Sequence, residues 1–335
     1  MLKPKYISPS SLTLFEKDPA SYYLRYFLGA AGFPTTEPMA CGTGFDCFVK
    51  SHIASVVGAD FDLEEQLLLG CTNRRTGEVR LLDWAREAGR YVFKQYQESG
   101  ALARLMLMVE RREGAVRFES GVSADIQGVP VFGKPDMFWA AKSTDLGGGG
   151  VGGAGGAGGA GALVMLDWKV NGVMAKNGIS PNKGYSWEWP SGKTHKLANV
   201  EGGCNMEDLN TAWADQVGIY ALALLGSVEE AAKCWYIIDQ TVGTGVPNVG
   251  SRTHRVPATG DMAAFANETG TVPFIFPKLR FATFKCHISE EYLRRICRRL
   301  VDMWKVVSYG PTHELFARGR DVEAVQSNKD VGFMF

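Results

Sequence analysis

A glycine-rich tract at 146–162, LGGGGVGGAGGAGGAGA, constrains the fold of this chain more than any other feature. Glycine and alanine offer almost no side-chain surface to bury, so the tract cannot belong to a packed core. The segments on either side, 116–141 and 163–170, alternate apolar with other residues or contain glycine turns, as β-strands do. The tract therefore predicts a flexible insertion between two strands, and we expect those strands to pair as a hairpin.

The same tract contains a formal G-x-G-x-x-G pattern at Gly153, Gly155 and Gly158. A dinucleotide-binding loop must follow a strand and begin a helix. Here the pattern belongs to a glycine–alanine repeat and leads into a strand, so we do not interpret it as a dinucleotide-binding loop. The sequence GKT at 192–194 resembles the end of a phosphate-binding loop, but Trp187 stands where that loop needs its first glycine. A nucleotide-hydrolysing enzyme is therefore disfavoured.

The rest of the chain predicts helices on both sides of these strands. Helices are expected at 8–29 with a break at Pro19, at 42–57 after a glycine-rich turn, at 81–98, at 206–226 and at about 289–309, and further strands at 233–240 and 281–288. This order predicts a mixed α/β fold. We treat residues 1–335 as a single domain, with a helical part at 1–110, a core at 111–240 that contains the insertion, and a strand and helix extension at 241–335.

Composition excludes several classes of protein. Lys and Arg number 36 and Asp and Glu also number 36, so any nucleic-acid contact must come from a local groove rather than from a globally basic surface. The seven cysteines form no C-x-x-C pair, which argues against a disulfide framework and a zinc ribbon and favours a reducing compartment. No apolar run reaches the roughly 18 residues that a membrane span needs, and the N-terminus lacks a signal-peptide core. We expect a cytoplasmic protein without membrane contact.

The strand at 163–170 carries an acid and a base in its middle. Because side chains alternate along a strand, Leu166 and Trp168 lie on one face, and Asp167 and Lys169 on the other. We expect the Trp168 face to meet the core and the charged face to meet water or a polar cleft, since unpaired charges are costly to bury. Taken alone, the pair is an ordinary surface ion pair of little energetic weight.

Other segments supply polar side chains that could form a site together with Asp167 and Lys169. Asp136 would lie beside Asp167 in the predicted hairpin, and two close carboxylates repel unless a cation such as Mg²⁺ or Mn²⁺ lies between them. Asp46 lies in the helix at 42–57, and Gln216 and Tyr220 lie four residues apart on one helix face. Three of these residues also have a structural interpretation. Asp136 could be a turn aspartate, Asp46 an acid favoured in the first turn of a helix, and Tyr220 a core tyrosine with a satisfied hydroxyl.

In their order along the chain, these segments resemble the motifs of a known family. SPSSLTLFEKDPASYYLRY, GTGFDCFVK, GKPD, LDWK and QVGIY together resemble the PD-(D/E)XK nuclease superfamily, in particular its RecB-like exonuclease branch. The resemblance covers about residues 7–225. One position departs from the pattern, because Asp46 stands where the branch usually has a histidine.

The resemblance implies a restriction-endonuclease-like core, which is a central mixed β-sheet flanked by helices, with a helical elaboration at the N-terminus. It implies hydrolysis of DNA phosphodiester bonds with Mg²⁺ or Mn²⁺ as cofactor. The implied catalytic residues are Asp136, Asp167 and Lys169, with Gln216 and Tyr220 supporting the site or the substrate. The implied metal ligands are Asp46, Asp136, Asp167 and the backbone carbonyl of Trp168.

We therefore expect an exonuclease of recombination, repair or phage DNA processing, with single- or double-stranded DNA as substrate and a helicase or recombinase as candidate partner. Some members of the branch carry an iron–sulfur cluster, but the late cysteines here lack its spacing, and Asp18-Pro19 stands where Cys-Pro is common. We expect no such cluster. The alternative function is a catalytically inactive, nucleic-acid-binding or scaffold subunit that keeps the fold.

Two further groups of residues have two interpretations each. Aromatic residues at 185, 187 and 189 could stack on single-stranded bases, or they could pack a loop. Four arginines, Arg294, Arg295, Arg298 and Arg299, could grip phosphates or form a solvated face on the last helix.

Overall fold

The computed structural model describes residues 4–30, 35–73, 76–141, 162–171, 186–188, 194–196, 199–243, 253–254, 272–273 and 279–322. The glycine-rich tract lies outside these ranges except for its last residue, Ala162, as do Tyr185 and Trp189. Within the described ranges, no helix is both long enough and apolar enough to cross a membrane.

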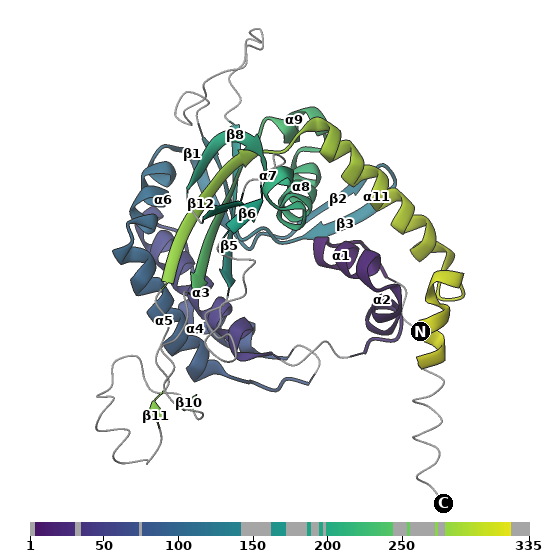
Figure 1. The fold of residues 1–335 in the computed structure, drawn as a ribbon, viewed down its shortest axis with the longest axis horizontal. Helices are drawn as coiled ribbons and strands as arrows, with labels where there is room; N and C mark the ends of the chain where they lie inside the picture. Colours follow the sequence, from purple (N-terminus) through teal and green to yellow (C-terminus); the bar gives the residue numbers. More distant parts are fainter. Residues whose placement is uncertain are drawn as a thin grey trace, which may run out of the picture.

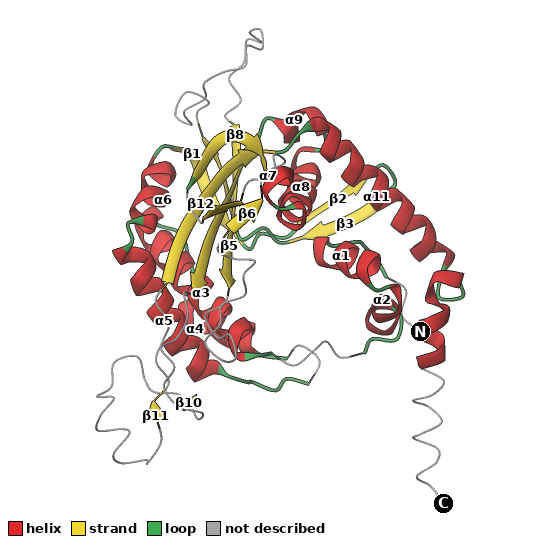
Figure 2. Cartoon of the chain, in the orientation of Figure 1, coloured by secondary structure: helices red, strands yellow, loops and turns green. Residues whose placement is uncertain are grey.

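A six-stranded mixed β-sheet forms the centre of the molecule, with helices against both faces (Figure 1, Figure 2), and this confirms the predicted fold class. In spatial order its strands are β1 (Arg112–Phe118), β4 (Met137–Ala141), β5 (Ala162–Asn171), β9 (Trp235–Gly243), β12 (Leu279–His287) and β8 (Val200–Asn205). β5 pairs antiparallel with β4 and parallel with β9. The hairpin expected across the glycine-rich tract is therefore present.

Helices from the N-terminal half cover one face of this sheet. They are α3 (Glu37–Val57), α4 (Leu63–Cys71), α5 (Leu82–Glu98) and α6 (Ala101–Glu110). Their apolar side chains pack on Trp139, Val164, Leu166 and Trp168, which point to this side from β4 and β5. We call this cluster the α3–α5 core.

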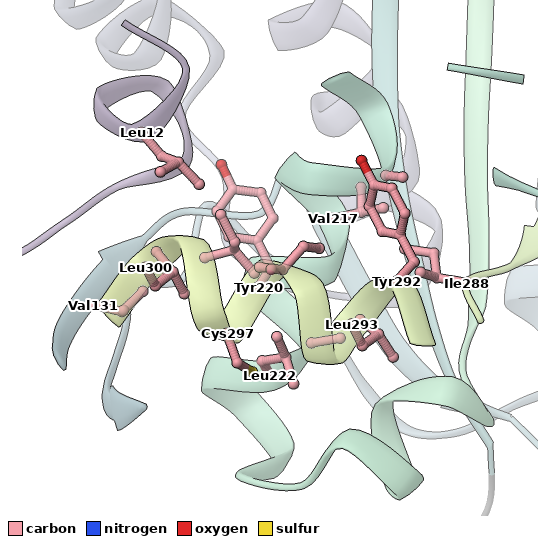
Figure 3. Packing of buried hydrophobic residues seen from close by; sticks show 14 of the residues in the cluster. Leu12, Val131, Val217, Tyr220, Leu222, Ile288, Tyr292, Leu293, Cys297 and Leu300 are labelled. Carbon is pink, nitrogen blue, oxygen red and sulfur yellow. The ribbon is translucent and has the colours of Figure 1, made fainter. Parts of the chain in front are cut away.

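A second cluster, the α8–α11 core, fills the opposite face (Figure 3). It is built by α1 (Pro9–Lys17), α2 (Pro19–Tyr26), α8 (Thr211–Leu225), α11 (Glu290–Tyr309) and the hairpin of β2 (Val122–Ile126) and β3 (Val129–Gly133). The sheet contributes Met165, Tyr236 and Phe284 to it. The first two helices thus pack in a different core from α3–α6, and the predicted extension at 241–335 supplies β12 and α11 to the sheet and core.

The remaining elements are short. They are α7 (Met206–Leu209), α9 (Val228–Ala232), a 3₁₀ turn at Glu314–Phe316, and the paired strands β6 (Ser186–Glu188) with β7 (Thr194–Lys196) and β10 (Thr253–His254) with β11 (Val272–Pro273). The helix predicted at 206–226 is two helices, because Asn210 interrupts it. The Asn210 side chain accepts hydrogen bonds from the backbone N–H groups of Ala212 and Trp213, which caps α8.

The predicted glycine-rich turn before the helix at 42–57 is wrong, because α3 begins at Glu37 and continues through both glycines. Gly44 lies where α3 crosses α5, and a Cβ atom there would be 1.8 Å from the carbonyl oxygen of Ala85. A Cβ on Gly89 of α5 would be 2.3 Å from the backbone carbon of Gly44. These glycines let two helix backbones touch, a tertiary contact that offsets their weak helix propensity.

Candidate functional site

The hairpin of β4 and β5 brings Asp136 and Asp167 together. Its register sets Met137 opposite Leu166, so Asp136, which directly precedes β4, falls next to Asp167. The backbone N–H of Trp168 donates to Asp136 Oδ2 at 3.1 Å and fixes that carboxylate. Burial raises the pKa of Asp167 well above its usual value, and the neighbouring Asp136 carboxylate raises it further.

Gln216 of α8 bridges Asp167 and Lys169 through two hydrogen bonds. Its Nε2 donates to Asp167 Oδ1 at 2.9 Å, and its Oε1 accepts from Lys169 Nζ at 2.8 Å. Lys169 also forms an ion pair with Asp167. The Asp167 side chain is 3% exposed and that of Lys169 is 25% exposed, so the carboxylate is covered while the lysine side chain is partly open to solvent.

The prediction that the charged face of this strand meets water or a polar cleft holds only in part, because Lys169 is partly exposed while Asp167 is buried against Gln216. Met165 is fully buried in the α8–α11 core, and α8 covers Asp167. The sheet is buried on both faces, so strand alternation sorts its residues between two cores rather than between core and solvent. The other half of the prediction is confirmed, because Leu166 and Trp168 pack in the α3–α5 core.

Tyr220 lies one helical turn after Gln216 and is part of the α8–α11 core, where Figure 3 shows it in the same cluster as Leu12 of α1 and Leu300 of α11. Its side chain closes against Gly133, where a Cβ atom would be 2.3 Å from Tyr220 Cε1. Burial raises the pKa of the Tyr220 hydroxyl, which a hydrogen bond with Gln216 opposes. The glycine of GKPD thus admits the ring of Tyr220, and Tyr220 supports Gln216.

A buried lysine that the sequence analysis missed joins Asp46 to this site. Lys50 of α3 is 1% exposed, and its Nζ lies 2.5 Å from Asp46 Oδ2 and 3.8 Å from Asp136 Oδ1. It also forms an ion pair with Glu119, and the Trp168 ring centroid is 5.8 Å from its Nζ. Burial alone would lower the pKa of Lys50, but the surrounding carboxylates raise it above its usual value. The i,i+4 spacing of Asp46 and Lys50 was the available signal.

Glu119 is the second missed residue, and its backbone is strained. It lies just after β1 with φ of 45°, in the left-handed region that residues other than glycine rarely adopt. Its N–H donates to the carbonyl oxygen of Asp136 at 3.3 Å, while its side chain pairs with Lys50. Such strain is characteristic of functional positions, and here it directs a carboxylate at a buried ammonium group.

The donor set suits a hard divalent cation, although its carboxylates do not form one compact group. Among the described residues, no three His, Cys, Asp or Glu side chains converge as a metal-binding group. Instead, Lys50 lies among Asp46, Glu119 and Asp136. Carboxylate oxygens are the ligands that Mg²⁺ and Mn²⁺ prefer, and Asp46 Oδ1 is buried without a hydrogen-bond partner. The pKa of Asp46 is raised to about 7 by desolvation of its carboxyl group, with Asp136 adding to the effect.

A divalent ion suits the protonation behaviour of this donor set. It contains four carboxyl groups and two lysines, namely Asp46, Glu119, Asp136 and Asp167 with Lys50 and Lys169. Burial and the neighbouring Asp136 raise the pKa of Asp46 and that of Asp167, and a bound cation would favour the ionised form of both groups. The residues present therefore fit a divalent ion, with Asp136 and Asp167 as the donors that the hairpin brings together. The role of the Trp168 backbone carbonyl as a metal ligand stays a prediction.

Three of the four late arginines contact other side chains of the protein, and one of them, Arg295, lies over the Tyr292 ring at 4.2 Å from its centroid. Arg299 pairs with Asp215 of α8 through both of its terminal nitrogens, at 2.6 and 2.8 Å, and also with Glu16 of α1. Arg294 pairs with Glu290 at 2.7 Å and with Glu229 at 3.4 Å. The Arg299 contacts tie α11 to α1 and α8 and favour a structural role for this residue, whereas Arg294 remains 54% exposed.

Comparisons with known proteins find little. No family model and no curated protein matches this sequence. Among solved structures, the fold is similar to the crystal structure of a protein named "Putative exonuclease" from Eubacterium rectale, with 11% identity, 90% of this chain and 80% of that chain covered, and a TM-score of 0.40. A likeness of this degree identifies neither a family nor an activity, so the function has to be argued from the residues of the site.

Proposed function

We propose that this protein is a divalent-metal-dependent nuclease that hydrolyses DNA phosphodiester bonds, with Asp136, Asp167 and Lys169 as its catalytic residues. The observation that supports this most is the hydrogen-bonded set of Asp167, Lys169 and Gln216 beside Asp136. These residues would offer carboxylates to a cation beside a partly exposed lysine side chain. Phosphodiester hydrolysis needs this combination of a cation site and a donor to developing negative charge.

In the proposed reaction, the residues of the site would bind the metal ion, orient the attacking water and stabilise negative charge. A bound Mg²⁺ or Mn²⁺ would supply positive charge to the phosphate and lower the pKa of a water molecule. Asp136 and Asp167 would hold this ion, with Asp46 and the carbonyl of Trp168 as further ligands. Lys169 would orient the attacking water and donate to the phosphate oxygen on which charge develops. Gln216 holds Asp167 and Lys169 in place, and Tyr220 packs behind it.

We further propose that the enzyme is an exonuclease of DNA recombination, repair or phage DNA processing, with a helicase or recombinase as candidate partner. This finer proposal rests on the order of the sequence motifs. Release of mononucleotides from end-labelled linear DNA, with covalently closed circular DNA left intact, would support it. Cutting of the closed circle would instead indicate an endonuclease.

The test of the activity itself uses single- and double-stranded DNA with Mg²⁺, Mn²⁺ or EDTA. We expect cleavage only with metal, and a loss of about 10²-fold or more in rate for Asp167→Ala and Lys169→Ala, the scale on which removal of one transition-state donor acts. Lys94→Ala is the matched control, because Lys94 is 71% exposed on α5 and pairs only loosely with Glu98. Equal cleavage by all four proteins would refute the assignment of the site.

A second candidate function is a non-catalytic DNA-binding or scaffold subunit. One observation favours it: Asp167, Lys169 and Gln216 are linked to one another by two hydrogen bonds and an ion pair, as they also would be in a purely structural role. Metal-independent DNA binding without cleavage of any DNA or RNA would establish this alternative.

A further inference from the structure

We propose that the ammonium group of Lys50 is a built-in cation of this site, occupying the position where a second divalent ion would otherwise bind. The site then takes one divalent ion, and removal of the Lys50 charge creates a second ion site. This inference rests on the proposed function, because it concerns the same donor set.

The surroundings of Lys50 are those of a bound cation. Its side chain is 1% exposed, and carboxylates approach it from three different segments: Asp46 from its own helix, Glu119 from the end of β1 and Asp136 from the start of β4. A buried ammonium group is stable only when such partners replace its hydration. A hard metal ion takes the same kind of oxygen donor, although these three carboxylates do not form a metal-binding group while Lys50 lies among them.

The strain at Glu119 shows that this arrangement has a cost that the fold accepts. Glu119 adopts a φ of 45° while its N–H holds the Asp136 carbonyl and its side chain reaches Lys50. A surface ion pair would not require such a backbone, because an exposed glutamate can pair from many rotamers at little energetic gain. The strained position makes sense if the Glu119 carboxylate must meet a charge at a fixed point.

Replacement of Lys50 by a neutral residue would leave the same carboxylates facing one another without a counterion. Asp46, Glu119 and Asp136 would then repel, and a divalent ion is the partner that relieves repulsion among oxygen donors most strongly. Asp136 lies farthest from Lys50, with 3.8 Å between Oδ1 and Nζ, and is tied to β5 through Oδ2. It is therefore the carboxylate that both cation positions would share.

The experiment counts bound ions directly. Mn²⁺ is titrated into the full-length protein, without DNA, by isothermal calorimetry and by the loss of the free-ion electron paramagnetic resonance signal. We expect one Mn²⁺ per chain for the natural protein and two for Lys50→Met, which keeps the length of the side chain without its charge. Lys94→Met is the control and should bind one. Adding Glu119→Gln to Lys50→Met should return the count to one, because Glu119 pairs with Lys50 and is not among the proposed ligands of the first ion.

Each outcome bears on a separate claim. Two ions in the natural protein, or one ion in a folded Lys50→Met variant, would overturn the role of Lys50 while leaving a metal nuclease intact. No Mn²⁺ binding by the natural protein would overturn the proposed function and, with it, this inference. Circular dichroism establishes that each variant is folded. The count for the natural protein tests the claim even if Lys50→Met does not fold.

Discussion

The crossing of α3 and α5 gives a sharp prediction, because α3 carries both Asp46 and Lys50. In Gly44→Ala, the new Cβ would lie 1.8 Å from the Ala85 carbonyl oxygen and 3.1 Å from the Gly89 Cα. Both neighbours are backbone atoms, so no rotamer change can relieve the clash and the helices must move apart. Overpacking of a core costs about 1–3 kcal/mol when side chains can adjust, and a backbone clash should exceed that, at about 3 kcal/mol or more.

Gly42→Ala is a matched control on the same helix. No atom lies within 4 Å of a Cβ at Gly42, and its φ is not positive. Alanine replaces glycine inside a helix with a gain of about 0.5–1 kcal/mol, so this variant should be slightly more stable than the natural protein. The two substitutions are chemically identical, and we expect them to change stability in opposite directions.

The assay is urea denaturation followed by circular dichroism, with the midpoints of the three proteins compared under one condition. We expect a lower midpoint for Gly44→Ala and an equal or higher midpoint for Gly42→Ala. Equal midpoints for the two variants would refute the close helix crossing. A folded Gly44→Ala protein should also bind Mn²⁺ less tightly, because displacement of α3 moves Asp46 and Lys50 away from Asp136.

The remaining predictions concern the supports of the site. Gly133→Ala should lower nuclease activity by pushing the Tyr220 ring away from Gln216, and it should cost less in a Tyr220→Leu background; additive effects in this double-mutant cycle would contradict the contact. Arg299→Met should destabilise the protein by about 2–4 kcal/mol, since it leaves the carboxylate of Asp215 largely buried without its bidentate partner. Arg298→Met, on the exposed face of the same helix, should change stability by less than about 0.5 kcal/mol, and equal losses for the two variants would count against the structural role of Arg299.

The sequence predicted best where local patterns and chain connectivity agree. The strands on either side of the glycine-rich tract were predicted to pair, and β4 and β5 do pair, with Asp136 beside Asp167. The last helix was also predicted correctly, since Ser289 caps it and α11 continues to Tyr309. Both results follow from short-range rules, namely strand alternation and helix capping.

The sequence failed where the partner of a residue lies far away in the chain. Gly42 and Gly44 look like a turn, because nothing local reveals that the backbone of α5 will press against Gly44. Asp167 looks solvated, because the helix that covers it comes some fifty residues later and only Gln216 meets its carboxylate. Lys50 looks like a surface lysine, because its partners Glu119 and Asp136 come from the sheet. In each case the deciding contact comes from tertiary packing, which the local sequence does not reveal.

The central claim is that Lys169 acts on the phosphate within a metal-dependent site. Its most direct test is the single-turnover rate of cleavage of end-labelled DNA at saturating Mn²⁺, compared between the natural protein and Lys169→Met. We predict metal-dependent cleavage by the natural protein and a fall of about 10²-fold or more in the variant, with the number of bound Mn²⁺ ions unchanged. Undiminished cleavage by Lys169→Met, or no cleavage by the natural protein under any metal condition, would contradict the account.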